Sequence, residues 1–102
     1  MPDREVAARL AALRRESVDL ERRLRGDEER APGSPDYWLS QIAMWRGLIG
    51  RTLTNYPIQQ RAIAQIPTAT AESPDWFERA LEEIAEVRAK LDSAIARLDP
   101  DD

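Results

Sequence analysis

The chain of 102 residues contains no cysteine and no histidine. Without cysteine there is no disulfide, no thiolate nucleophile and no sulfur ligand for a metal. Without histidine the usual zinc sites, the Ser-His-Asp triad and the most common general base are excluded. Because so little catalytic chemistry is left, we expect a non-catalytic protein that uses neither a cofactor nor a metal.

Long apolar runs are also missing. No run approaches the ~18 residues that a membrane-spanning helix needs, and the first ten residues, MPDREVAARL, are charged rather than signal-like. We therefore expect a soluble, cytoplasmic protein that does not act on a membrane. The net charge of −4 does not favour a general polyanion binder. A length of 102 residues is enough for one modest core, so we expect a single helical domain over residues 1–102.

The most apolar stretch runs from Tyr37 to Thr54, YWLSQIAMWRGLIGRTLT. Drawn as a helix, it has apolar or small residues on nearly every side, which is typical of a buried helix. Its large apolar face carries Trp38, Ile42, Trp45, Ile49 and Leu53. The strip expected to face water is narrow and carries Ser40, Gln41, Met44 and Arg51. The pattern predicts a buried central helix over residues 35–54.

Two longer helices are predicted at the ends of the chain. Over residues 3–25 a heptad seam carries Val6, Leu10, Leu13, Ser17, Leu20 and Leu24. Over residues 74–98 a second seam carries Phe77, Leu81, Ile84, Arg88, Leu91, Ile95 and Leu98. Each seam has one polar member, Ser17 in the first and Arg88 in the second. The fold predicted is an all-α three- or four-helix bundle, with long first and last helices packed around the central helix.

Capping residues and prolines set the remaining boundaries. Gly26 is predicted to stop the first helix. The matching segments SPDYW and SPDWF predict that Ser34 and Ser73 cap the next two long helices. A short helix over about 57–65 is expected to turn Ile58, Ala62 and Ile66 to one side, and residues 99–102 form an acidic tail.

The two seams are longer than the central helix can cover. A helix of twenty residues spans ~30 Å, whereas the outer helices span ~35–37 Å. We therefore expect the surplus parts of the two seams to pack on each other or on a second copy of the chain. This predicts a protein-interaction module, namely an adaptor, accessory subunit or assembly factor in a homo-oligomer or hetero-complex. The predicted interaction seam consists of Ser17, Leu20, Leu24, Arg88, Leu91, Ile95 and Leu98.

Small residues form a stripe along the central helix: Ala43, Gly47, Gly50 and Thr54. Each glycine inside a helix costs about 1 kcal/mol relative to alanine. A helix that crosses closely over the stripe would offset this cost. We therefore predict that the stripe is a groove for close packing of a neighbouring helix.

An alternative follows from residues 39–58, LSQIAMWRGLIGRTLTNYPI, which resemble the helix-turn-helix pattern of DNA-binding regulators. Ala43, Gly47, Leu48 and Leu53 match the alanine, turn glycine and apolar positions of that pattern. The resemblance implies a turn at Gly47–Gly50 and a short recognition helix after it. Its candidate DNA-binding residues are Arg51, Thr52 and Asn55.

Three weaker alternatives concern single motifs. The tripeptide Trp45-Arg46-Gly47 resembles the motif in the turn of small helical-hairpin secretion substrates, although here it falls inside a predicted helix. Glu82, Glu83 and Glu86 resemble the acidic triad of helical nucleotide pyrophosphohydrolases, but a solvated charged face is the preferred interpretation. Trp38 and Trp45 are candidates to line a pocket for a small apolar ligand.

Overall fold

A computed structural model describes residues 2–30 and 35–99, with side chains for 2–26 and 35–99. These residues contain no strand and form four helices: α1 (Asp3–Arg30), α2 (Pro35–Thr52), α3 (Pro57–Ala64) and α4 (Trp76–Leu98). The prediction of an all-α bundle is confirmed. Within the described residues, no helix combines the length and the apolarity that crossing a bilayer requires.

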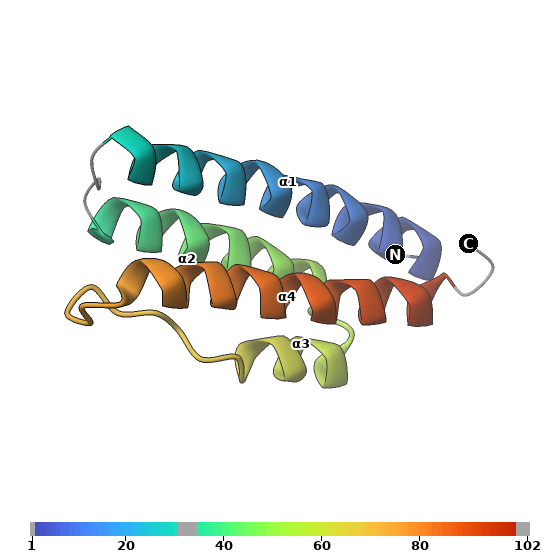
Figure 1. Cartoon of the computed structure of the whole chain (residues 1–102). Helices are drawn as coiled ribbons and strands as arrows, with labels where there is room; N and C mark the ends of the chain where they lie inside the picture. The colour runs from blue at the N-terminus through green and yellow to red at the C-terminus, as the bar shows by residue number, and fades with distance from the viewer. Residues whose placement is uncertain (1, 31–34, 100–102) are drawn as a thin grey trace.

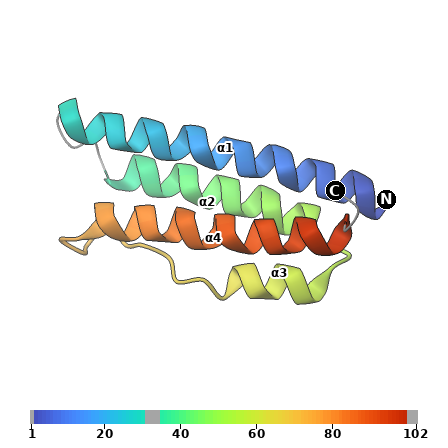
Figure 2. The same cartoon turned by 45° about the vertical axis from the view of Figure 1, so that its right-hand side comes forward.

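The three long helices lie side by side as rods, and the short α3 lies outside them, below α4 (Figure 1). The chain runs along α1 in one direction and along α2 and α4 in the other, as the turned view also shows (Figure 2). The largest contact between helices is that of α1 with α4. The ion pairs Arg14–Asp92 (2.5 Å) and Arg4–Asp99 (3.9 Å) join these two helices in their antiparallel arrangement.

The heptad seams of α1 and α4 fill the core. Leu10, Leu24, Ile84 and Leu91 are fully buried there, and α2 adds Ile42 and Ile49. The surplus parts of the two seams pack on each other, which is the first of the two expected arrangements, and they are therefore not open to a second copy. Of the predicted interaction seam, Ser17, Leu20, Leu24, Leu91 and Leu98 are buried within the chain, and Arg88 and Ile95 are half-buried.

The polar members of the two seams meet each other. Arg88 Nε donates a hydrogen bond to Ser17 Oγ (2.9 Å), and Arg88 Nη2 donates one to Glu21 Oε1 (2.7 Å). Ser17 is fully buried, and its hydroxyl donates to the Arg14 carbonyl. These bonds hold the pKa of the Glu21 carboxyl below its ordinary value, chiefly through the hydrogen bond from Arg88. The α1–α4 interface is thus registered by a polar cluster as well as by leucines.

Two of the predicted helix boundaries are wrong. The first helix passes through Gly26 to Arg30, because Gly26 keeps a helical backbone and no described glycine has a positive φ. Ser73 does not cap α4. Its hydroxyl donates to the Asp75 carboxylate, which lowers the pKa of Asp75, and α4 begins only at Trp76. Ser34 and residues 100–102 of the predicted tail lie outside the described residues.

The segment after α2 packs on the bundle through only part of the predicted side. Ile63 and Ile66 are buried, together with Ala69 in the connection to α4. Ile58 is instead 73% exposed. The helix α3 begins at Pro57, as predicted, after the N-cap residue Tyr56.

Candidate functional site

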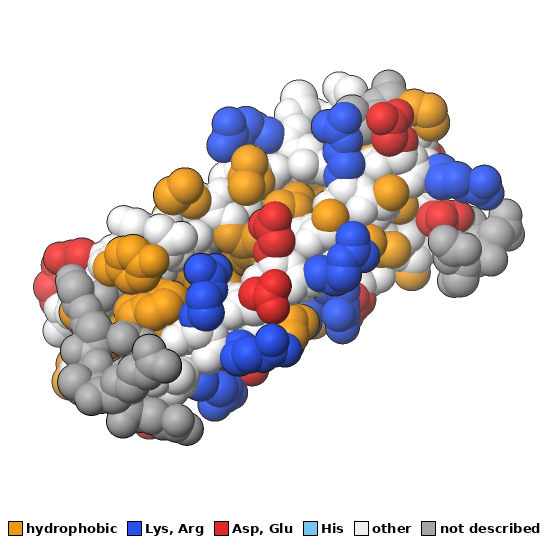
Figure 3. Space-filling view, turned by 90° about the horizontal axis from the view of Figure 1, so that it is seen from above, with side chains coloured by type: hydrophobic (Ala, Val, Ile, Leu, Met, Phe, Trp, Pro, Cys, Tyr) orange, Lys and Arg blue, Asp and Glu red, His pale blue; other side chains and the backbone are white. Residues whose placement is uncertain are grey.

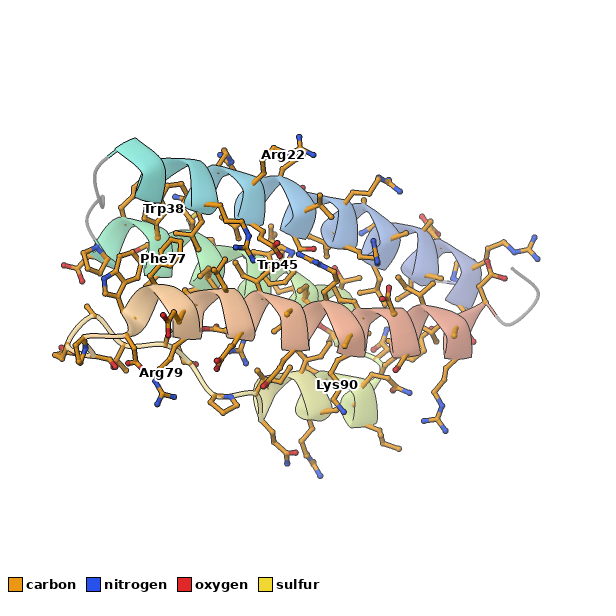
Figure 4. The ribbon with its side chains drawn as sticks, viewed as in Figure 1. Arg22, Trp38, Trp45, Phe77, Arg79 and Lys90 are labelled. Atoms are coloured by element: carbon orange, nitrogen blue, oxygen red, sulfur yellow. The ribbon has the colours of Figure 1, made fainter. Side chains whose placement is uncertain are left out.

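The buried side of α2 is fixed by one aromatic anchor. Trp38, Ile42, Trp45 and Ile49 are buried on this side. The indole Nε1 of Trp45 donates a hydrogen bond to the Leu13 carbonyl of α1 (2.8 Å). Figure 4 shows Trp38 and Trp45 lying between the helices, while Arg22 and Arg79 point away from them. Both tryptophans are therefore structural parts of the core.

Next to Trp45, the side chain of Arg46 also turns inward. One terminal nitrogen, Nη2, donates to the carbonyls of Ile63 (2.8 Å) and Ile66 (3.1 Å) at the end of α3. The other, Nη1, donates to Thr68 Oγ1 (3.3 Å) and to Glu83 Oε2 of α4 (2.8 Å). A cation among the last carbonyls of a helix is favourable because those carbonyls lack partners within the helix.

Glu83 completes this buried cluster. Its side chain is only 2% exposed, and its second oxygen, Oε1, accepts a hydrogen bond from the Ala69 amide (2.9 Å). One ion pair thus joins α2, the end of α3, the following connection and α4. No described buried side-chain nitrogen or oxygen lacks a hydrogen-bond partner. The buried side of α2 is therefore held by packing and by directional bonds.

The opposite side of α2 has no covering helix among the described residues. Met44 is 64% exposed, Tyr37 53% and Leu48 42%, all large apolar side chains in one line. We call this side the open face, and its exposed residues are Asp36, Tyr37, Ser40, Ala43, Met44, Gly47, Leu48 and Arg51. It is wider and more apolar than the narrow strip expected from the sequence.

The small stripe lies on this open side. Ala43, Gly47 and Thr54 are exposed, and Gly50 is half-buried. A Cβ atom placed on Gly47 or Gly50 would meet nothing within 4 Å. The prediction that another helix of this chain packs closely along the stripe is therefore wrong, because α1 and α4 contact other sides of α2 and α3 meets the stripe at its Gly50 end, where the Gln60 side chain donates to the Gly50 carbonyl (2.7 Å).

Two shallow recesses adjoin the open face. The first, of about 320 Å³, lies between α1 and α2 and is lined by Glu16, Asp19, Leu20, Arg23, Gln41, Met44, Trp45 and Leu48. Trp45 lines this recess, and Trp38 does not. Seen from above (Figure 3), the side of the molecule on which α1 lies shows hydrophobic side chains between acidic and basic ones. The first recess combines the same kinds of side chain.

The second recess, of about 290 Å³, lies at the C-terminal end of α2. It brings together Arg9 of α1 with Arg51, Thr52 and Asn55. The Tyr56 hydroxyl, also in this recess, donates to the Asp3 carboxylate, and this bond raises the pKa of Tyr56. The recess is therefore basic, and α1 helps to form it.

The turn required by the helix-turn-helix resemblance is absent, because α2 is one continuous helix through Gly47 and Gly50. Arg51, Thr52 and Asn55 lie at its end around the second recess, and not on a separate recognition helix. The same continuity places Trp45-Arg46-Gly47 in mid-helix rather than in a turn. The acidic triad is divided as well, since Glu83 is buried while Glu82 and Glu86 are exposed. No group of three possible metal ligands occurs among the described residues.

Sequence reasoning missed Arg46 and Glu83, although both leave a signal. Ile42, Arg46, Ile49 and Leu53 are spaced 4, 3 and 4, so Arg46 occupies a seam position as Ser17 and Arg88 do. Glu83 lies beside Ile84, between Ala80 and Val87, on the widened apolar stripe of α4. A charge at a seam position predicts a buried pair.

Comparisons of the chain with protein-family models, with curated proteins and with solved structures found no match. The function is therefore inferred from the open face and its two recesses.

Proposed function

We propose that this protein is a non-catalytic helical interaction module, an adaptor, accessory subunit or assembly factor that binds protein through the open face of α2. The observation that carries the proposal is the line of exposed apolar side chains Tyr37, Met44 and Leu48. Exposed apolar side chains grouped on one face mark interaction sites more often than isolated ones do.

The shape of the surface suits a helix as the bound element. An amphipathic helix that lies in a groove uses apolar contacts one or two turns apart. Tyr37, Met44 and Leu48 follow such a spacing, and the recess between α1 and α2 runs beside Met44 and Leu48. Tyrosine is a frequent anchor at interfaces, and methionine adapts to differently shaped partners.

The rigid support behind this face also favours binding. Trp45 and Arg46 fix the position of α2 from its buried side. A surface that is already ordered loses little conformational entropy when a partner binds. The buried cluster of Arg46 and Glu83 thus serves the proposed function by holding the open face in place.

A photo-crosslinking experiment tests the proposal. Benzoylphenylalanine would replace Met44 in one variant and Ile58 in a matched control, since both residues are exposed and apolar but Ile58 lies on α3. Expressed in the native host, the position-44 variant is expected to crosslink to protein, either a second copy or another chain. Equal or absent crosslinking at the two positions would contradict the proposal.

A further inference from the structure

The open face is complementary to itself, and we propose that its occupant is a second copy of this chain, with the two α2 helices antiparallel across a twofold axis. The inference rests on the proposed function and names its partner. The axis passes between Ala43 and Met44, the midpoint of the open face. A twofold interface requires that the same patch serve both copies, so each residue must suit the residue opposite it.

Charge complementarity gives the antiparallel direction. Asp36 and Arg51 are both exposed and lie at opposite ends of the face, each about 11 Å from its midpoint at the helical rise of 1.5 Å per residue. Within the described part of the chain neither of them is in an ion pair. Antiparallel packing brings Asp36 of each copy to Arg51 of the other. Parallel packing would instead bring like charges together at both ends.

The second recess strengthens this match. Arg9 lines the recess together with Arg51, so two guanidinium groups lie at the end of α2 that would receive the carboxylate, although Arg9 also pairs with the exposed Glu5 of its own helix (3.8 Å). The Arg51 Nε reaches the Gly47 carbonyl of its own helix only at 3.5 Å, which leaves its terminal nitrogens free to donate to a carboxylate. Bidentate pairing with a carboxylate is the geometry that arginine favours.

The sizes of the side chains also fit a twofold pairing. Met44 would lie next to its own counterpart at the axis, and Tyr37 would lie opposite Gly50 of the second copy, within one turn of Leu48. Ser40 would lie opposite Gly47, where the missing Cβ allows the two backbones to come close. The Tyr37 ring is already held edge-on against Trp38, with 5.0 Å between ring centroids. The small residues thus gain the close helix that they lack within one chain.

The expected dimer is reversible. α2 has 18 residues and is therefore about 27 Å long. One helix face with the adjoining flank of α1 gives an interface at the lower end of the range for specific complexes, in which about 800 Å² per partner is standard. Dissociation should therefore be measurable by dilution.

Sedimentation equilibrium of the full chain over a range of concentrations tests the proposal. The wild-type chain should change from one to two times its mass of 11.6 kDa as concentration rises. Asp36→Arg and Arg51→Asp should each raise the dimer Kd about tenfold, because two exposed ion pairs become two repulsive contacts. An equimolar mixture of the two variants should recover the wild-type Kd, since in the mixed dimer every contact again pairs opposite charges.

A second variant pair guards against effects on folding. Met44→Glu places two carboxylates at the axis and should abolish the dimer, whereas Ile58→Glu, an equally exposed change on α3, should leave it intact. Circular dichroism confirms that each variant folds. A wild-type chain that stays monomeric at the highest concentration, or a mixture of Asp36→Arg and Arg51→Asp that does not associate, overturns the proposal. If position 44 then crosslinks to a different protein, the inference fails while the proposed function stands; if it crosslinks to nothing, both fail.

Discussion

The two sides of α2 differ in burial and in polarity, although they are built from neighbouring residues of one helix. On one side Arg46 is almost fully enclosed and donates hydrogen bonds to Glu83 and to carbonyls of the α3 segment. On the other side Met44 and Leu48 face solvent. A charged residue is thus inside and apolar residues are outside.

This difference shows that burial follows the number of packing partners rather than the hydrophobicity of the residue alone. α1 and α4 cover one side of α2, and an arginine on that side is kept because every polar partner it needs is present. No described helix covers the opposite side, so its apolar side chains remain exposed. We interpret the buried side as structural and the open side as functional.

The largest effect on stability is expected from a substitution on the buried side of α2. Arg46→Met should lower the free energy of unfolding by about 3–5 kcal/mol, because Glu83 is left charged and buried without its partner. Urea denaturation, monitored by circular dichroism, measures this change in the free energy of unfolding. Arg22→Met, a change at an exposed residue of α1, is the control and should cost no more than about 0.5 kcal/mol.

The double variant Arg46→Met, Glu83→Leu sharpens the same test. Removing both charges should recover part of the lost stability, because no uncompensated buried charge then remains. A loss for Arg46→Met no larger than that of Arg22→Met would show that the buried pair does not hold the fold.

A smaller change in stability, and one of opposite sign, is expected from a substitution on the open face. Gly47→Ala should raise the free energy of unfolding by about 1 kcal/mol, since alanine is the better helix former and the added Cβ meets no atom of the chain. Gly26→Ala, inside α1 and equally unobstructed, should stabilise the monomer in the same way.

The two glycine variants are expected to differ in self-association. Only Gly47→Ala should weaken the dimer, because only Gly47 lies where the second copy comes close. Denaturation at low concentration and sedimentation at high concentration separate the two effects. Loss of monomer stability in Gly47→Ala would mean that the open face is covered by part of this chain.

The smallest expected effect is on how the free energy of unfolding depends on pH, through the contact between α1 and α4. The hydrogen bond from Arg88, with a smaller contribution from Arg25, holds the pKa of Glu21 below its ordinary value of 4.5 in the folded chain. The unfolded chain therefore binds this proton more readily. The stabilisation is fully present above pH 4.5 and is lost as the pH falls through the lower folded pKa. The loss should be seen as a fall in unfolding free energy between pH 5 and the acid limit.

Glu21→Gln should remove this part of the pH dependence. The same change made in an Arg88→Met background should have a smaller effect, because the guanidinium that lowers the pKa of Glu21 most is already gone and only Arg25 still acts on it. If Glu21→Gln alters the acid slope equally in both backgrounds, Arg88 is not the cause of the lowered pKa.

The sequence was a good guide to the helices and a poor one to the faces of α2. The helical period of the apolar residues and the positions of the prolines predicted the four helices. The two heptad seams predicted the residues that fill the core. The spacing also marked Ser17 and Arg88 as polar exceptions, yet it did not show that they bond to each other. Such a bond depends on the antiparallel register of α1 and α4, which joins residues 71 positions apart.

By itself the sequence determined that the chain is a helical bundle without histidine or cysteine chemistry, because composition and local period depend on the residues alone. Tertiary structure alone decided which side of α2 is covered. Helices apolar on several sides can be packed in more than one way, and only the positions of α1, α3 and α4 select one. That selection buries Arg46 and leaves Tyr37, Met44 and Leu48 exposed on the face through which we propose that the protein binds.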